Sequence, residues 1–252
     1  MGSVLWSELT AEELRTKAEQ NAIVVLPVAS TEQHGPHLGT GVDTLLCGAV
    51  CKAAAERVGD GSVVLAPTLW CGMAEHHMAL GGTFTLDIPT YRAVLLCLLK
   101  SLERHGFKRV LVVNGHGGNV NALNAFMPDF ARETALTIRV TTYFLLAQPL
   151  LAPLAEDQSG VLHACEVETS MMMALAPQAV REDRFETAHG MLGTHIDALL
   201  HPAVGGFRAF AAMTPTGVIG DARRASRAKG EAMFDACAEA LAAALRQPET
   251  FA

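Results

Sequence analysis

Acidic and imidazole side chains gather in one stretch near the start of the chain. Residues 30–44 read STEQHGPHLGTGVDT and hold Glu32, His34, His37 and Asp43. A loop needs Gly, Pro, Asn or Ser to turn, so these acids and imidazoles call for a chemical explanation. Mixed carboxylate and imidazole ligands suit Zn²⁺, Mn²⁺ or Fe²⁺. Because residues i and i+2 of an extended segment point the same way, Glu32 and His34 can reach one site.

Two later segments carry the same residue types. They are NGHGGN at 114–119 with His116, and HACEVETS at 163–170 with His163, Glu166 and Glu168. A carboxylate such as Asp43 can bridge two ions, and two ions ~3.5–4 Å apart can hold and activate a water. The three segments together therefore predict a site for two divalent metal ions.

Each segment also has a structural explanation. Asp43 precedes an apolar helical pattern and could cap that helix. NGHGGN could be a plain turn or a phosphate cradle, although it lacks the Gly-Lys-Ser/Thr ending of a P-loop. Glu166 and Glu168 could form a solvated helix face. The metal hypothesis rests on all three segments meeting at one edge of a sheet.

The composition favours an enzyme with a large core. The 252 residues are 50% hydrophobic and 18% charged, with a net charge of −7. No run of Lys or Arg is present, which argues against binding to nucleic acid. No apolar run is long enough for a membrane span, and none resembles a signal peptide. The six cysteines form no Cys-x-x-Cys pair, so we expect reduced thiols and a cytoplasmic protein.

Strand and helix patterns alternate along the chain. Strands are expected at 22–28, 62–69, 109–114 and 137–145. Helices are expected at 9–20 with Thr10 as N-cap, 45–59, 89–106, 121–135 around Pro128, 164–176, and 221–247 with Asp221 as N-cap. This alternation predicts an α/β fold with a mainly parallel sheet, formed by a single domain. Ligands of such sheets bind beyond the carboxyl ends of the strands, which is where Glu32 and His116 fall.

The motifs STEQHGPHLGTGVDT, NGHGGN and ETS, with the run SLERHGFKRVLVVNGHGGN, resemble the signatures of the creatininase family of metal-dependent amidohydrolases. The resemblance implies a three-layer α/β/α sandwich and a dinuclear metal site. It also implies hydrolysis of a non-peptide C–N bond in a small molecule, and a homo-oligomer that is commonly a hexamer. By motif match the metal ligands are Glu32, His34, Asp43 and His116, with Asp43 bridging. Candidates for substrate contact by the same resemblance are Glu75, His77 and Gly117.

One position departs from the family pattern. Members that hydrolyse creatinine carry Tyr-Glu where this chain has Gly117-Gly118, and that Glu is a metal ligand there. Its loss argues against creatinine as the substrate and requires a replacement carboxylate. Glu168 is the first candidate and Glu166 the second. Residues two apart in a helix point about 200° apart, so the two carboxylates cannot both face the metals equally. The Gly-Gly type resembles relatives acting on formamides, other cyclic amides or peptide-like precursors.

The expected reaction uses a hydroxide held between two metal ions to attack an amide carbonyl. His163 would carry a proton to the leaving nitrogen, and Glu166 would assist if it is not a ligand. A non-catalytic metal-binding or nucleotide-binding regulatory protein is the alternative. In the loop-rich region 177–220 we expect apolar residues to pack against neighbouring subunits and to help close the sites. These residues are Phe207, Phe210, Val218 and Ile219.

Overall fold

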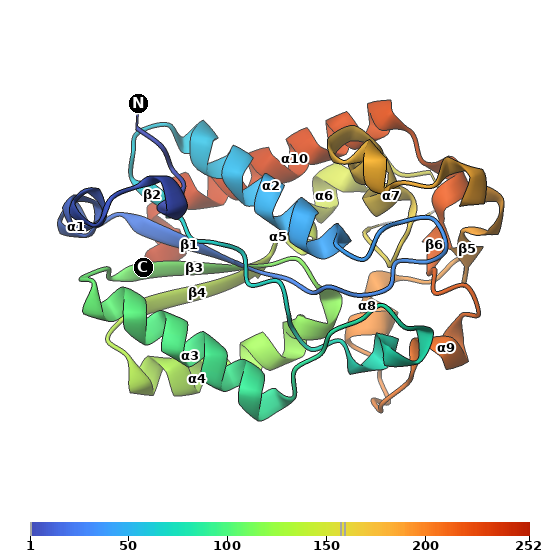
Figure 1. Cartoon of the computed structure of the whole chain (residues 1–252), viewed down its shortest axis with the longest axis horizontal. Coiled ribbons are helices and arrows are strands. Elements are labelled where there is room, and N and C mark those ends of the chain that lie inside the picture. Colours follow the sequence, from blue (N-terminus) through green and yellow to red (C-terminus); the bar gives the residue numbers. More distant parts are fainter. Residues whose placement is uncertain (1, 157, 159) are drawn as a thin grey trace.

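The fold is built on a four-stranded sheet. The computed structural model describes residues 2–156, 158 and 160–252. The strands are β1 (Ile23–Val28), β2 (Val63–Leu65), β3 (Arg109–Asn114) and β4 (Thr137–Thr142). They lie in the order β2-β1-β3-β4, and every pair is parallel (Figure 1). The predicted α/β class with a parallel sheet is therefore confirmed.

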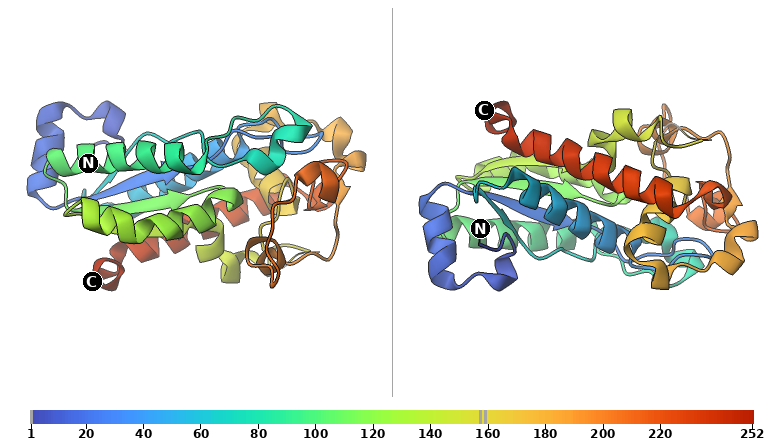
Figure 2. Two further views of the ribbon diagram at one scale, coloured as in Figure 1. Left: turned by 90° about the horizontal axis from the view of Figure 1, so that it is seen from below. Right: turned by 90° about the horizontal axis from the view of Figure 1, so that it is seen from above.

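Helices cover both faces of this sheet, as the two turned views show (Figure 2). One face carries α2 (Val42–Val58), α7 (Glu166–Leu175) and α10 (Arg227–Arg246). The other face carries α1 (Ala11–Glu19), α3 (Ile88–Arg104) and α4 (Val120–Glu133). Successive strand residues feed opposite layers, so Val25 belongs to one apolar core and Val24 to the other. The three layers expected from the motifs are thus present.

The connections that follow two neighbouring strands run to opposite faces of the sheet. After β1 the chain enters α2 on one face, whereas after β3 it enters α4 on the other face. β1 and β3 are neighbours, so the topological switch point lies between their carboxyl ends. Such a switch point is the usual place for a ligand in an open α/β sheet. Glu32 follows β1, and His116 follows β3.

Short elements make up the rest of the described chain. They are η1 (Trp6–Glu8), η2 (Glu75–Leu80), η3 (Gly117–Asn119), α5 (Tyr143–Leu146), α6 (Gln148–Leu151), η4 (Pro177–Ala179), η5 (Glu182–Thr187), β5 (His189–Gly190), α8 (Ile196–Leu200), α9 (Phe210–Met213), β6 (Gly220–Asp221), η6 (Ala222–Arg224) and η7 (Pro248–Phe251). Several of them surround the carboxyl end of the sheet, at the right in Figure 1. Among the described residues, no helix combines the length and apolar character that crossing a membrane requires.

The ends of several elements differ from expectation. Ser226 caps α10, whereas Asp221 caps the short η6 turn before it by accepting from the Arg223 N–H. Gly41 stands at the N-cap of α2, so Asp43 lies inside the first turn of the helix rather than capping it. Helix α4 runs through Pro128 without a break.

The segment 177–220 contributes more to the core than its sequence indicates. Val218 and Ile219 are fully buried and Phe210 is 8% exposed, all within this chain. The expectation that these three residues pack against a neighbouring subunit is therefore wrong. Phe207 alone of the four is open to solvent, with 72% of its surface exposed.

Candidate metal centre

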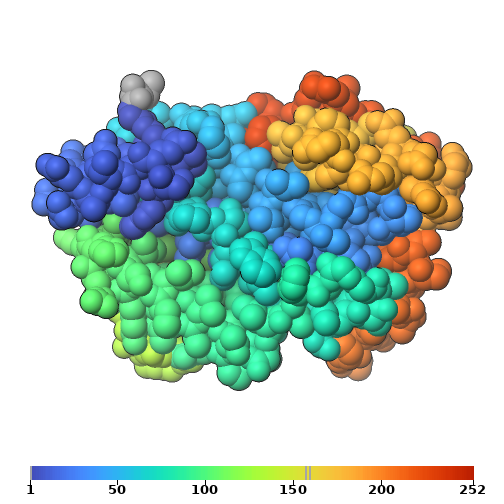
Figure 3. Space-filling view, in the orientation of Figure 1, coloured from blue at the N-terminus to red at the C-terminus, as the bar shows by residue number. Residues whose placement is uncertain are grey.

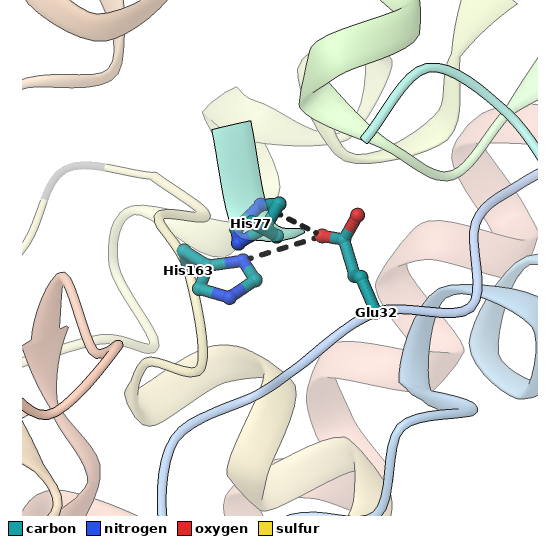
Figure 4. A group of neighbouring side chains, drawn as sticks. All are labelled: Glu32, His77 and His163. Atoms are coloured by element: carbon teal, nitrogen blue, oxygen red, sulfur yellow. Dashed lines mark ion pairs between the residues drawn. The ribbon is translucent and has the colours of Figure 1, made fainter. Parts of the chain in front are cut away.

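Glu32 lies at the centre of a group of imidazoles. Its Oε1 atom is 3.1 Å from His116 Nδ1, 3.2 Å from His77 Nε2 and 3.7 Å from His163 Nδ1. Figure 4 shows His77 and His163 converging on this carboxylate from separate elements. Glu32 follows β1, His116 follows β3 and His77 belongs to η2, so distant parts of the sequence meet here.

Asp43 connects this group to a second one. Its Oδ2 atom is 3.0 Å from His116 Nδ1, and its Oδ1 atom is 3.2 Å from His34 Nε2. The same nitrogen of His34 is 3.8 Å from Glu168 Oε2. Asp43 is held in the first turn of α2 and Glu168 in the first turn of α7, at 3% and 5% exposure. The two oxygens of Asp43 therefore face two different sets of partners, as a bridging carboxylate requires.

Backbone carbonyls orient three of the imidazoles. His34 Nδ1 lies 3.2 Å from the Glu32 carbonyl, and His116 Nε2 lies 3.1 Å from the Met73 carbonyl. His163 Nε2 is likewise 2.9 Å from the Gln33 carbonyl. A carbonyl oxygen only accepts, so each of these nitrogens carries the hydrogen. The opposite nitrogen of each ring faces the carboxylates, and when deprotonated it can offer its lone pair to a metal ion, which is how metal-binding histidines are usually held.

The cluster lacks partners for several buried polar atoms. Both oxygens of Glu32, Oδ2 of Asp43 and Nε2 of His34 have no hydrogen-bond partner among the described residues. Buried polar atoms without partners are costly unless a cation or a water completes them. Three triplets of ligand atoms each lie within 4.8 Å of one another: Glu32–His77–His163, His34–His163–Glu168 and Glu32–His34–Asp43. The donor set therefore fits divalent ions.

The raised pKa values of two imidazoles also indicate a site for cations. Burial lowers the pKa of His116, but Glu32 and Asp43 outweigh this effect and raise it to about 10. Burial also opposes the charged form of His34, and Asp43 and Glu168 nevertheless hold its pKa well above the usual value. The carboxylates thus draw positive charge onto these imidazoles. A bound cation supplies the same charge in place of the protons.

The structure brings together seven of the predicted site residues. They are Glu32, His34, Asp43, His77, His116, His163 and Glu168. Gly117 lines the cavity above them. Glu75 does not reach the cluster, because it is the exposed first residue of η2.

Glu166 is buried but faces away from the cluster. Its Oε1 accepts from Lys229 Nζ at 2.7 Å, and its Oε2 accepts from the Glu156 N–H at 3.0 Å. Glu166 and Glu168 therefore point to opposite sides of α7, with Glu168 toward His34. Glu166 ties the start of α7 to α10.

His76 and Gln33 also contribute, and the sequence analysis assigned neither of them to the site. His76 and Phe210 line the cavity, and Gln33 Nε2 lies 2.8 Å from His77 Nδ1. The adjacent imidazoles of EHHM were a signal for His76. Phe210 was expected to help close the site, and it does line the cavity, but it does so within its own chain.

The cluster forms the floor of one cavity of about 640 Å³. Pockets of ~300–1,000 Å³ are typical for small-molecule ligands. The walls come from η2, from the glycines after β3, and from residues 191–213. In the space-filling view, the teal residues after β2 lie beside the orange residues of the segment 191–213 at the right of the molecule (Figure 3).

Gly118 has no room for a side chain. A Cβ atom at this position would lie 2.6 Å from both His76 Cε1 and the Met73 carbonyl oxygen, and would also meet His116 Nε2. His76 stacks on His116 with 5.6 Å between the ring centroids. The His76–His116 pair therefore packs directly against Gly118 and leaves no space for the glutamate expected here in creatinine-hydrolysing relatives.

The sequence profile described as creatininase, creatinine amidohydrolase, matches residues 7–245. The chain belongs to the creatininase family. It is 30% identical over 263 residues to the creatinine amidohydrolase of Pseudomonas putida, with 97% of each chain covered. It is 32% identical over 215 residues to the mycofactocin precursor peptide peptidase of Mycolicibacterium smegmatis, covering 84% of this chain and 79% of that one.

Solved structures agree with this family membership. A crystal structure of creatinine amidohydrolase superposes with a TM-score of 0.81 at 28% identity, covering 100% of this chain and 99% of that one. Creatininase structures of Zn–Zn and Mn types each match with a TM-score of 0.78 at 29% identity, covering 99% or more of both chains. The chain is therefore a creatininase-family hydrolase with buried His and Glu candidates for a metal site.

Proposed function

We propose that this protein is a metal-dependent amidohydrolase that cleaves a non-peptide C–N bond of a small cyclic amide or formamide. The observation that carries the proposal is the meeting of Glu32, Asp43 and Glu168 with three oriented imidazoles under one cavity. A structural metal site needs no cavity, whereas a catalytic site keeps an open position for substrate.

Five residues would hold two divalent ions, of Zn, Mn or Fe. They are Glu32, His34, Asp43, His116 and Glu168. Asp43 would lie between the ions, since its two oxygens face His116 and His34 separately. Bound divalent ions supply an acidified water and polarise an amide carbonyl. His77 would contact the Glu32 carboxylate, 3.2 Å from its Oε1 atom, and it lies at the cavity floor.

His163 would move the proton that the reaction requires. Its burial, with His34 and His77 close by, holds its pKa well below the usual value, so the ring is neutral. Nε2 is engaged with the Gln33 carbonyl, and Nδ1 faces the cluster. During hydrolysis the water oxygen bonds to the carbonyl carbon, the C–N bond breaks and the nitrogen gains a proton. Nδ1 would accept the proton from water and return it to that nitrogen.

Glu75 and Glu166 have no direct part in this proposal, because neither lies in the cluster. Gly117 would leave space for the substrate at the cavity wall. Creatinine is a poor candidate, since Gly118 lacks the carboxylate and the space for one. We further expect a cytoplasmic homo-oligomer, hexameric by resemblance, which sedimentation would reveal.

Metal analysis and activity assays test the proposal together. The purified protein should contain about two divalent ions per chain. Loaded with Zn²⁺, Mn²⁺ or Fe²⁺, it should hydrolyse members of a panel of lactams, cyclic ureas and formamides, and creatinine only weakly. The matched control is Leu192→Ala, because Leu192 is 57% exposed and lies outside the cavity. Absence of bound metal after gentle purification would contradict the proposal, and brisk creatinine hydrolysis would overturn the choice of substrate.

A further inference from the structure

The outer wall of the cavity differs in character from its floor. The floor carries the acids and imidazoles, whereas the wall from residues 191–213 is largely apolar. Its members include Leu199, Leu200, Val204, Phe207, Phe210 and Met213. This wall is formed by residues 191–195, α8, α9 and the link between the two helices.

The apolar wall begins directly at the reactive groups. The Phe210 ring lies 4.0 Å from the His77 ring and 4.9 Å from the His163 ring, centroid to centroid. Helix α9 packs against η2, as Figure 1 also shows. A substituent next to the scissile carbon or nitrogen would therefore meet apolar side chains at once.

Part of this wall stays uncovered by the chain itself. Val204 is 85% exposed and Phe207 is 72% exposed, although both line the cavity. A small polar ring would leave these side chains in water, whereas an aliphatic or aromatic group would cover them. Removal of apolar surface from water favours binding of the larger group.

One cationic side chain completes the wall. Among the described residues that line the cavity, Arg208 is the one arginine or lysine. Arg208 stands on the apolar wall formed by residues 191–213, and it is exposed. A carboxylate on the substrate would pair with the Arg208 guanidinium on this wall, while the amide lies at the floor.

We propose that the substrate is an amide of an apolar amino acid: a formyl or similar small acyl group on a nitrogen that bears a bulky apolar side group and a free carboxylate. This inference rests on the proposed function. For a formyl compound, the water oxygen bonds to the formyl carbon, the C–N bond breaks and the amine nitrogen takes the proton. The products are formate and the free amino acid.

Matched substrates test the inference on the metal-loaded protein. We expect kcat/KM for N-formyl-leucine to exceed that for N-formylglycine at least about tenfold. N-formyl-leucinamide, which lacks the carboxylate, should be slower than N-formyl-leucine. Leu200→Ala and Phe207→Ala should each reduce the leucine-to-glycine ratio. Arg208→Gln should reduce the acid-to-amide ratio.

Leu192→Ala is the control within the same segment, because Leu192 is exposed and does not line the cavity; it should retain both ratios. Equal rates for the glycine and leucine compounds would overturn the inference while leaving the proposed hydrolase intact. If no amide is turned over, the proposed function fails, and calorimetric binding still decides the inference. Tighter binding of N-formyl-leucine than of N-formylglycine supports it, and equal binding overturns it.

Discussion

The side-chain amide of Gln33 sets the tautomer of His77. Gln33 Oε1 accepts from the Gly35 N–H at 3.0 Å, so the amide nitrogen is the atom that lies 2.8 Å from His77 Nδ1. That nitrogen donates, and Nδ1 must accept. The hydrogen of neutral His77 is then on Nε2, 3.2 Å from Glu32 Oε1. His77 therefore turns its N–H toward the Glu32 carboxylate, an electrostatic contact without the geometry of a hydrogen bond.

Gln33→Glu should weaken the site without unfolding the protein. A carboxylate cannot donate to His77 Nδ1, so the imidazole would move its hydrogen to Nδ1 or become charged. Loss of a second-shell partner typically costs ~10–100-fold in metal affinity or activity. Nitrogen chemical shifts of His77 report the tautomer directly. Unchanged shifts and unchanged metal affinity would show that Gln33 has no such role.

The two acids of α7 should respond differently to neutralisation. Glu168→Gln should lower the metal content from about two ions to about one per chain, because Glu168 faces His34. Glu166→Gln should retain both ions and lower the free energy of unfolding by about 1–3 kcal/mol, since it weakens the contact with Lys229. Elemental analysis and denaturant unfolding measure the two effects. If Glu168→Gln keeps two ions, the replacement-ligand hypothesis is wrong.

Introducing at position 118 the glutamate expected in creatinine-hydrolysing relatives should damage the site. In Gly118→Glu the new Cβ would press on His76, 2.6 Å from Cε1, and on His116. We expect metal affinity to fall ~10–100-fold, as for other disturbances of a ligand's surroundings. His76→Gly in the same chain should recover part of the loss by making room. Full metal affinity in Gly118→Glu alone would show that His76 moves aside freely.

Gly230 allows α10 to approach α7 closely. An added Cβ would overlap the Ser170 carbonyl and lie 2.9 Å from the Met171 nitrogen. Gly230→Ala should therefore lower the free energy of unfolding by about 3 kcal/mol, as overpacking does. Ala232→Gly, on the exposed side of the same helix, is the control, with an expected loss of about 1 kcal/mol. Similar losses in both variants would argue against the close contact.

The metal-free protein should lose stability as pH rises above neutrality. Burial lowers the pKa of His116, but Glu32 and Asp43 raise it to about 10, above the ordinary 6.5. The stabilisation is complete below pH 6.5 and is lost as pH approaches 10. Metal binding should strengthen over the same interval, since ligands must be deprotonated. Chemical unfolding of chelator-treated protein measures the first effect. His116→Asn should remove it, and equal slopes for the two proteins would contradict the assignment.

Local patterns predicted the sheet and most of the cluster. Glu32 and His116 follow strands with clear apolar runs, and the rule for parallel sheets then places them together. The helix caps were harder, because Asp221 and Ser226 are both good N-caps and tertiary packing selects between them. Phe210 and the His76–Gly118 contact depend on segments far apart in sequence, which no local pattern encodes. That all 252 residues form one domain stays a prediction.

Helix α10 holds no residue of the cluster, yet α2 and α7 both pack against it. Asp43 enters the site from α2 and Glu168 from α7. The distance between these two carboxylates therefore depends on how α2 and α7 pack against α10. Ions of different radius require different spans. Substitutions along the buried side of α10 would thus tune which ion the protein prefers, from positions that never touch it.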